Sequence, residues 1–315
     1  MSAVRCPVVR LFFFILIFLG PVASSAAPLS PVSAVRNMLT RPDRQLDYGE
    51  AIIAIDGVVD ATRQSSSTTA MIDRLVDAAR QMAGPKPTDS YKLSAVRKAI
   101  YDAGAWNFNR AFEYDHADPY GNVLTNRLLS TYIRTRKGNC VSMPILFLIV
   151  ADRMGLNVHL GAAPLHLFVR YTDPRGIDHN LETTSGGHEA RTEWYRQNLP
   201  MSDKAINNGV YMRTLSKRES IAEMANIVLD AMLEQHRYQE AIDVADAILA
   251  VNPLEGYAMV KKGTAYGALL QTEFLDKYAY PALIPPAQRA RYAMLGRQNE
   301  KAFKDAEALG WEPEK

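Results

Sequence analysis

The alternation of apolar and polar residues predicts a mainly helical first part of the chain. Apolar residues recur at helical spacing over residues 46–82, with a break at the serine cluster 65–67, so two helices are expected there. Further helices are predicted over residues 91–103 and 124–134, whereas residues 108–122 are aromatic, polar and irregular. This pattern favours a bundle of short helices ahead of the segment that holds the candidate chemistry.

Two segments stand out within this pattern. Residues 29–44 are interrupted by Pro and Arg, and we expect them to form a loose leader. The most apolar segment begins at Cys140 (CVSMPILFLIVADRMG). Asn139 is a favourable N-cap, Pro144 is tolerated near the first turn, and Gly155 is a favourable stop. The sequence therefore predicts a buried helix with its cysteine at the N-terminal end.

Short strands are predicted after this helix, over residues 157–162, 165–172 and 177–184. The glycine pair Gly186 and Gly187 is expected to end the strand-rich region. The chain therefore changes from helix to a small antiparallel sheet soon after Cys140.

The register of the hairpin LHLFVRYT-DPRG-IDHNLETT follows from its apolar residues, which occupy odd positions in both strands. The turn Asp-Pro-Arg-Gly supplies odd-to-odd pairing when its glycine is left-handed and Asp173 pairs with Ile177. In this register Glu182 is the diagonal neighbour of His166, roughly 7–8 Å away between backbones, a gap that a glutamate can bridge. Asn180 is two residues further away and is the weaker partner.

From Glu219 onward the sequence is Ala-rich and helical, without strand signals. Residues 237–253 (RYQEAIDVADAILAVNP) have Tyr, Ala and Pro at tetratricopeptide-like spacing, and Gly263 and Tyr266 restart the pattern. Roughly one and a half to two repeats are too few to stand alone, so we expect them to pack on the preceding domain. Residues 272–315 are expected to remain helical.

The composition describes a folded, nearly neutral chain. It has 315 residues, 48% of them apolar and 22% charged, with a net charge of +2. This size suits one large domain or two ordinary ones, and the apolar share excludes disorder. The charge balance argues against a nucleic-acid-binding protein. Two cysteines exclude a disulfide framework and a Cys-rich metal site, and no cofactor is expected.

The N-terminus has the layout of a secretory signal. Two arginines precede the apolar run 11–19 (LFFFILIFL), and Gly-Pro and small residues follow it up to Ala27. The run is short of the ~20 apolar residues that a spanning helix needs, and no later segment is long enough, so no stable membrane insertion is expected. We expect residues 1–27 to be a signal peptide and the mature protein to be periplasmic or secreted.

Cleavage would leave a single thiol. It would remove Cys6 and two of the 36 basic residues, leaving 34 against 34 acidic residues. Cys140 would then be alone in a compartment that is expected to be oxidising. A lone thiol there is either a buried inert residue or a reactive one.

Cys140, His166 and Glu182 are the candidate catalytic residues. A helix N-terminus and an imidazolium both favour the thiolate, and a carboxylate behind the histidine fixes its tautomer. The backbone N–H groups after Cys140 could receive an oxyanion, as could Asn122, although a turn role for Asn122 is the more common one. Taken singly, the cysteine could be core packing and the histidine a bystander. Together they match the pattern of one cysteine with a distant histidine and acid.

A metal site is the other chemical alternative. It would draw on His116, His166, His179, Glu182 and His188. None of their spacings matches a zinc signature, and in the register above His179 points away from His166. No metal is therefore expected.

These motifs resemble the transglutaminase-like superfamily, a branch of the papain-fold cysteine enzymes. The motifs are GNC at a helix start, HLFVRY on a strand and an acid on the next strand. The whole mature chain is similar to the bacterial group that pairs this core with C-terminal tetratricopeptide-type helices. Supporting segments are LDYGEAIIAIDGVVD, LLSTYIRTRKGN, ADRMGLNV, PLHLFVRY and VYMRTLSKRES.

The resemblance implies an α+β fold. A papain-like core, with a central helix packed on a small antiparallel sheet and helices before it, would span residues 28–218. An all-α tetratricopeptide-like region would span residues 219–315.

The resemblance also implies roles for three residues: Cys140 as nucleophile, His166 as general base and Glu182 as orienting acid. The chain departs from the family pattern in two places. The family acid is usually Asp followed by Pro, whereas Thr183 follows Glu182 here, and Val141 replaces the aromatic residue that follows the cysteine in transglutaminases. Many members of this group lack the cysteine.

We therefore expect an exported, cysteine-dependent amide-acting enzyme: a peptidase, amidase or transamidase that works through an acyl-thioester on a protein or peptide substrate. Hydrolysis is the default outcome, because no segment marks an amine-acceptor site. The alternative is a non-catalytic module whose C-terminal helices bind a protein partner.

Overall fold

The computed structural model describes residues 30–63 and 65–313. The expected signal peptide, residues 1–27, and Cys6 lie outside the described residues. The helices are α1 (Pro31–Leu39), α2 (Tyr48–Val59), α3 (Ser65–Ala83), α4 (Asp89–Tyr101), α5 (Leu129–Thr135), α6 (Ser142–Arg153), α7 (Thr192–Asn198), α8 (Asp203–Asn207), α9 (Lys217–Met224), α10 (Asn226–Glu234), α11 (Tyr238–Val251), α12 (Gly256–Leu270) and α13 (Pro286–Leu309). The strands are β1 (Glu113–Tyr114), β2 (Lys137–Gly138), β3 (Val158–Ala163), β4 (His166–Thr172), β5 (Asp178–Glu182) and β6 (His188–Ala190).

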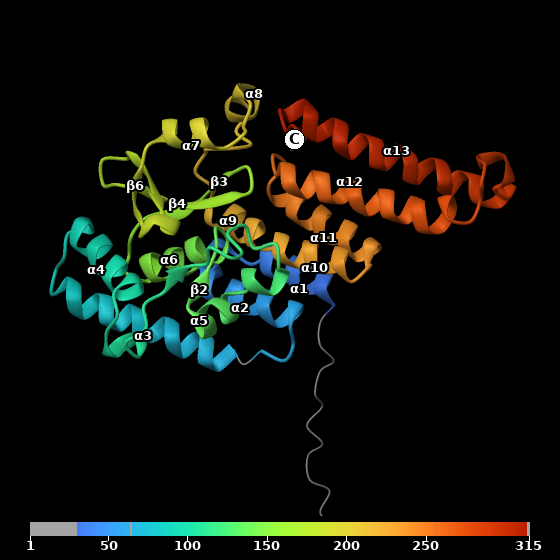
Figure 1. The fold of residues 1–315 in the computed structure, drawn as a ribbon. Coiled ribbons are helices and arrows are strands. Elements are labelled where there is room, and N and C mark those ends of the chain that lie inside the picture. The colour runs from blue at the N-terminus through green and yellow to red at the C-terminus, as the bar shows by residue number, and fades with distance from the viewer. Residues whose placement is uncertain (1–29, 64, 314–315) are drawn as a thin grey trace, which may run out of the picture.

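An antiparallel sheet in the order β3-β4-β5-β6 lies between helices on its two faces (Figure 1). On one face, side chains such as Leu160 and Val169 join the main core with α6. On the other face, Phe168 packs against Tyr195 of α7, with ring centroids 4.7 Å apart. The predicted central helix on a small antiparallel sheet is therefore present, and both sheet faces are covered.

Helix α6 is buried along its length, as its apolar sequence predicts. Its residues from Ser142 to Ala151 are all buried, which is typical of a helix that is apolar all round. The N-cap is Val141 and not Asn139 as the sequence predicted, but the side chain of Asn139 still accepts hydrogen bonds from Val141 N and Ser142 N at the start of the helix. The helix itself begins at Ser142, so Cys140 lies just ahead of it and not in its first turn.

The hairpin register is confirmed. Val169 pairs with Leu181, and Tyr171 pairs with His179. The turn is closed by a hydrogen bond of 2.9 Å from Asp173 N to the carbonyl of Ile177. The turn glycine, Gly176, has a φ of +80°, a left-handed conformation that glycine adopts without steric cost.

The prediction of a loose leader over residues 29–44 is wrong, because α1 occupies most of this segment. Ser30 caps this helix through a hydrogen bond of 3.2 Å from Ser33 N, and Pro31 occupies the first turn, where its missing N–H costs nothing. Val35 and Leu39 are buried on the face that packs against α11. The prolines and arginines therefore mark the ends and the exposed face of a helix.

The helix predicted over residues 124–134 is divided in two. A 3-10 helix, Leu124–Arg127, precedes α5, and the backbone of Leu128 between them is extended. The buried carboxylate of Asp56 on α2 accepts hydrogen bonds from Leu129 N and Ser130 N, at 3.2 and 2.6 Å. This long-range cap starts a new helix, and local sequence gave no sign of it.

Strand pairing also continues beyond Gly186 and Gly187, where the sequence predicted its end. The two glycines take left-handed conformations and turn the chain back, so that β6 pairs with β5. The short helix α7 follows and covers the sheet.

The C-terminal region is all-helical, as expected, and it packs on the rest of the chain. Helix α11 contacts α1, and α10 contacts α2, so the main apolar core runs through both parts. Helices α12 and α13 lie side by side and extend away from the sheet, and the end of α13 returns to α8 (Figure 1). Ser202 Oγ donates to Gly310 O at 2.7 Å in that contact. The tetratricopeptide character of these helices and the boundary between residues 218 and 219 stay predictions.

Candidate active site

Cys140 lies between a loop and the start of β4. Its backbone N–H donates to Pro119 O at 3.2 Å, and its carbonyl accepts from Leu167 N at 3.3 Å. Its Sγ donates to Leu165 O at 3.2 Å. The residue is only 1% exposed. The thiol is therefore held against the residue that precedes His166.

The environment of Cys140 favours the protonated thiol. Burial raises its pKa to about 12, the nearby positive charge of Arg127 works in the opposite direction, and the charge of Glu182 raises it further. The sequence-based expectation that a helix N-terminus and an imidazolium would favour the thiolate is not met in this conformation. Desolvation outweighs the favourable charge.

His166 and Glu182 form a short contact, with 2.7 Å between Nε2 and Oε2. The same carboxylate oxygen accepts from Tyr195 Oη at 2.9 Å, and the other oxygen accepts from the backbone and hydroxyl of Thr184. Burial works to raise the pKa of Glu182, but His166 and Thr184 hold it below its ordinary value. Glu182 is therefore an ionised acceptor whose oxygens are both engaged.

This contact determines which ring nitrogen of His166 can exchange a proton. With Glu182 ionised, Nε2 carries the hydrogen that the carboxylate accepts. Among the described residues, none forms a hydrogen bond with Nδ1. Nδ1 is thus the ring atom that can accept a proton from a thiol or return it to a leaving group.

The backbone N–H groups expected to receive an oxyanion are occupied. Val141 N and Ser142 N both donate to Asn139 Oδ1, at 3.0 and 3.1 Å, and Cys140 N donates to Pro119 O. Of these three N–H groups, only that of Cys140 bonds to the loop that contains Pro119. Movement of that loop would free the N–H of Cys140.

Asn122, the candidate oxyanion donor, lies in this loop with an exposed side chain. Its backbone N–H donates to Asp118 Oδ1 at 2.6 Å, and Val123 N and Asn126 Nδ2 donate to the other oxygen of the same carboxylate. Asn122 is therefore a turn residue, and its role as an oxyanion donor stays a prediction.

Arg127 joins this loop to the C-terminal helices. Its Nε donates to Gly121 O, and its NH1 contacts Asp230 of α10, both at 2.5 Å. Asp230 also accepts from Tyr257 Oη at 2.7 Å and lies 3.0 Å from Lys261 Nζ, both on α12. The loop that accepts from Cys140 N is thus anchored to a buried charge cluster in the C-terminal region.

Tyr195 is the site residue that sequence reasoning missed. It is fully buried on α7, and its ring lies 5.9 Å from the ring of His166. The sequence around it, TEWYRQN, falls beyond Gly187, where the strand region was expected to end. A buried tyrosine needs a hydrogen-bond partner, but nothing local identified Glu182 as that partner.

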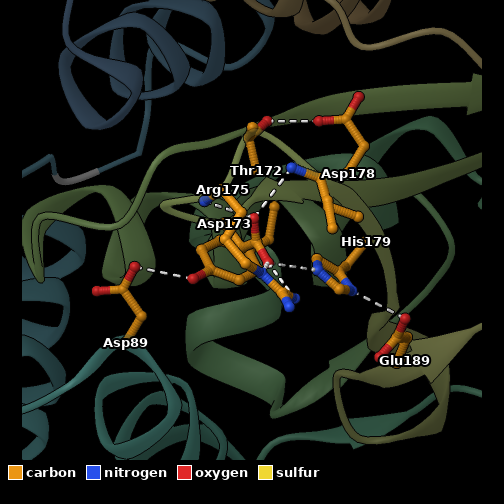
Figure 2. A network of polar contacts seen from close by, with 9 residues as sticks. Asp89, Thr172, Asp173, Arg175, Asp178, His179 and Glu189 are labelled. Carbon is orange, nitrogen blue, oxygen red and sulfur yellow. Dashed lines mark hydrogen bonds and ion pairs between the residues drawn. The ribbon is translucent and has the colours of Figure 1, made fainter.

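His179 belongs to a separate polar network near the turn of the hairpin, which Figure 2 shows. Its Nδ1 lies 2.9 Å from Glu189 Oε1, and its Nε2 lies 3.4 Å from Asp173 Oδ2. Tyr171 Oη donates to Asp89 in the same network, at 2.8 Å. Among residues 30–63 and 65–313, no group of three or more His, Cys, Asp or Glu side chains could hold a metal ion.

Two cavities lie away from Cys140. One of about 560 Å³ is lined by residues such as Arg74 and Trp106, and one of about 430 Å³ lies between the start of α4 and the hairpin turn at Pro174. Neither is lined by Cys140 or His166. The described helices include none long and apolar enough to cross a membrane.

The sequence profile of the transglutaminase-like superfamily matches residues 66–226, just over half of the chain. The chain belongs to the transglutaminase-like superfamily. This match confirms the family that the sequence motifs indicated, and its range includes Cys140, His166 and Glu182. Members of this superfamily often have cysteine-dependent catalysis.

Similar proteins with curated descriptions are UPF0162 proteins, a name that states no activity. One from Buchnera aphidicola subsp. Baizongia pistaciae is 24% identical over 229 residues, which cover 71% of this chain and 81% of the relative. One from the Schizaphis graminum subspecies is 25% identical and covers 56% of this chain and 64% of the relative. BU173, from the Acyrthosiphon pisum subspecies, is 21% identical and covers 70% and 80%.

Proposed function

We propose that this superfamily member is a cysteine-dependent amide-acting enzyme with Cys140 as nucleophile, His166 as general base and Glu182 as orienting acid. The observation that carries the proposal is the 2.7 Å contact between His166 Nε2 and Glu182 Oε2, one residue beyond the carbonyl that accepts the thiol hydrogen bond. An inert core cysteine needs no such polar arrangement beside it. A fully engaged carboxylate behind the histidine is the arrangement that nucleophilic catalysis uses.

In the proposed reaction the thiol of Cys140 transfers its proton to His166 Nδ1 as Sγ attacks the carbonyl carbon of an amide. Glu182 stabilises the resulting imidazolium. The tetrahedral intermediate then collapses, the C–N bond breaks, and Nδ1 gives its proton to the leaving amine. Water attacks the acyl-thioester, transfers a proton to Nδ1 and releases the carboxylic acid, and the thiol is restored.

The closed conformation must open before this reaction. Pro119 O occupies the backbone N–H of Cys140, and the sulfur is buried. Displacement of the loop by substrate would expose the sulfur and free that N–H for the oxyanion. It would also remove the desolvation that raises the pKa of the thiol.

A second candidate function is a non-catalytic protein-binding module that uses the tetratricopeptide-like helices. The burial of Cys140 and its raised pKa favour this candidate. Under either function we propose export to the periplasm or the exterior, on the basis of the N-terminal signal layout.

The two candidates are separated by a peptide acyloxymethyl ketone, which alkylates the thiol of cysteine enzymes. The mature chain is treated at pH 5–9, and the adduct is mapped by mass spectrometry. Catalysis predicts labelling at Cys140 that falls at least tenfold in His166→Ala. Iodoacetamide after unfolding should label both proteins equally, as the control for an intact thiol. Labelling at one rate in both folded proteins, with an apparent pKa near the ~8.5 of free cysteine, would count against catalysis.

A further inference from the structure

Large apolar side chains are exposed around Cys140. Tyr120, Val123, Leu165 and Trp194 are 53%, 55%, 48% and 45% exposed. We call these four residues the apolar rim. Single exposed apolar residues are ordinary, whereas several around one reactive group are typical of a binding surface.

The three segments that carry the apolar rim are linked to the site by specific contacts. Tyr120 follows Pro119, whose carbonyl accepts from Cys140 N, and Val123 is in the same loop. Leu165 accepts the thiol hydrogen bond. The ring of Trp194 lies edge-on to Tyr195, with centroids 5.1 Å apart. Three separate segments therefore present apolar side chains beside the proposed catalytic residues.

Tyr114 also lies beside the site. It pairs with Gly138, two residues before Cys140. Burial and the nearby Cys140, Tyr120 and Glu182 raise its pKa, in keeping with this position. The rim and the proposed nucleophile belong to one neighbourhood.

Leu165 has an unfavourable backbone conformation for its side chain. It is the second residue of the two-residue turn between the paired Ala163 and His166, and its φ is +53°. Glycine or asparagine suits such a position, and leucine is strained there. The side chain is also half exposed, so core packing does not explain it. Residues in strained backbone conformations cluster at active sites and ligand-binding positions. A ligand contact made by the Leu165 side chain would account for its strained conformation.

The charged groups that influence Cys140 are committed to internal partners. Glu182 is held by His166, and Asp118 is held by its own loop. Arg127 is paired with Asp230. These groups are not available to bind a charged substrate side chain, which leaves the apolar rim as the recognition surface next to the thiol.

We propose that the apolar rim binds an apolar or aromatic side chain on the acyl part of a peptide, next to the amide that Cys140 attacks. The substrate class is a peptide with Phe, Leu or a similar residue at that place, and not Asp or Lys. This inference rests on the proposed function. The acyl part stays bound to Sγ in the thioester, so it contacts the side chains closest to the sulfur.

The test uses acyloxymethyl ketones that differ only in the residue next to the ketone: Phe, Leu, Asp or Lys. Labelling of Cys140 in the mature chain is followed by intact mass and peptide mapping. The Phe and Leu probes are expected to react at least tenfold faster than the Asp and Lys probes, since one apolar contact gives discrimination of about 10- to 200-fold. Leu165→Gly and Tyr120→Ser should each reduce this preference several-fold.

Leu283→Ser is the matched control, because Leu283 is 60% exposed but lies far along the C-terminal region. It should leave rates and preference unchanged, and Leu165→Gly should unfold at no lower a temperature than the wild type. If all four probes react at equal rates that still depend on His166, the apolar rim does not determine specificity, and the proposed function is retained. Absence of any His166-dependent labelling would overturn both.

Discussion

Glu182 is one methylene longer than the aspartate that is usual in the family, yet its carboxylate still reaches the ring of His166. It reaches His166 diagonally across the β4–β5 pair, and it is also held by Tyr195 and by Thr184 two residues further along. Four donors on two oxygens fix the rotamer of a side chain that would otherwise be flexible. The departure from the family pattern is therefore compensated by local hydrogen bonds.

Glu182→Gln should slow labelling of Cys140 by about 10²-fold or more and keep the fold, because the amide no longer stabilises the imidazolium. Asn180→Ala should change labelling by less than about threefold. Asn180 instead donates to Ala190 O and Thr192 Oγ1 at the sheet edge, so its loss should cost about 1–2 kcal/mol of unfolding free energy. Probe labelling rates and urea unfolding measure the two effects. The reverse order of labelling rates would exclude Glu182 as the orienting acid.

Tyr195→Phe should keep the packing on Phe168 and His166 but remove one hydrogen bond from the charged form of Glu182. The pKa of Glu182, which is below its ordinary value in the fold, should rise. The stability from that lowered pKa is present above the unfolded value of about 4.3 and is lost as the pH falls through the folded value. The variant should therefore be less stable than wild type at pH 7, by about 1–2 kcal/mol, and the difference should shrink below pH 4.

Urea unfolding at pH 7 and pH 3.5 checks this prediction. Trp194→Phe is the control, because Trp194 lies on the same helix and has no hydrogen bond to Glu182. Phe168→Tyr is unsuitable because it adds a buried hydroxyl. A stability difference that is the same at both pH values would show that the hydroxyl of Tyr195 does not act through the charged form of Glu182.

The sequence predicted the His166–Glu182 pair but not its other partners, for a physical reason. Strand alternation and turn chemistry are short-range rules, and together they determined the register from Leu165 to Thr184. Tyr195 approaches from α7 through the packing of one layer on another, which depends on the whole chain. The hydrogen bond from Cys140 N to Pro119 O is likewise a long-range contact that local sequence did not indicate.

At the scale of elements, the differences between prediction and structure occur where a distant side chain ends or starts a helix. The apolar pattern indicated a helix over residues 124–134, but Asp56 on α2 caps Leu129 and Ser130 and interrupts it. Residues 29–44 looked irregular because α1 is short and begins with Pro31. Its stability comes from burial against α11, since a helix of this length is marginal alone.

Asp56→Asn tests this cap. Burial raises the pKa of Asp56 to about 6, although the N–H groups of Ser130 and Leu129 lower it. Its folded pKa is above the unfolded value, so its contribution to stability is full below pH 4 and is lost as the pH rises through about 6. Relative to the variant, wild type should lose on the order of 2–3 kcal/mol between pH 4 and pH 7. Chemical unfolding of both proteins across this range measures the difference, and a constant difference would contradict the raised pKa.

At the scale of the whole molecule, the C-terminal helices and the candidate site form one structure. The sequence predicted that the helices would pack on the core, because so few repeats cannot stand alone. It did not indicate that the contact would reach the loop over Cys140. The contact between the loop and the C-terminal helices depends on Arg127, which is one of several arginines in its part of the sequence. Its pairing with Asp230 follows from the tertiary structure and not from local sequence.

Arg127→Gln should loosen the loop over Cys140 and leave the site otherwise intact. The substitution removes both the bond to Gly121 O and the buried ion pair, so the hydrogen bond from Cys140 N to Pro119 O should open more often. Loss of the positive charge would raise the pKa of the thiol, but exposure to water would lower it more, because burial is the larger cause. Exchange of the Cys140 amide hydrogen should therefore accelerate at least tenfold, and iodoacetamide should react faster at pH 8.

Lys261→Gln is the matched control, since Lys261 shares the partner Asp230 but does not contact the loop. Both variants lose one cation from a buried cluster and should be less stable, by up to roughly 3–5 kcal/mol. Only Arg127→Gln should change exchange at Cys140, which separates a specific anchor from general destabilisation. Equal acceleration in the two variants would mean that the loop responds to the stability of the C-terminal helices as a whole. In that case the link between the helices and the thiol would be cooperative packing and not the Arg127–Asp230 pair.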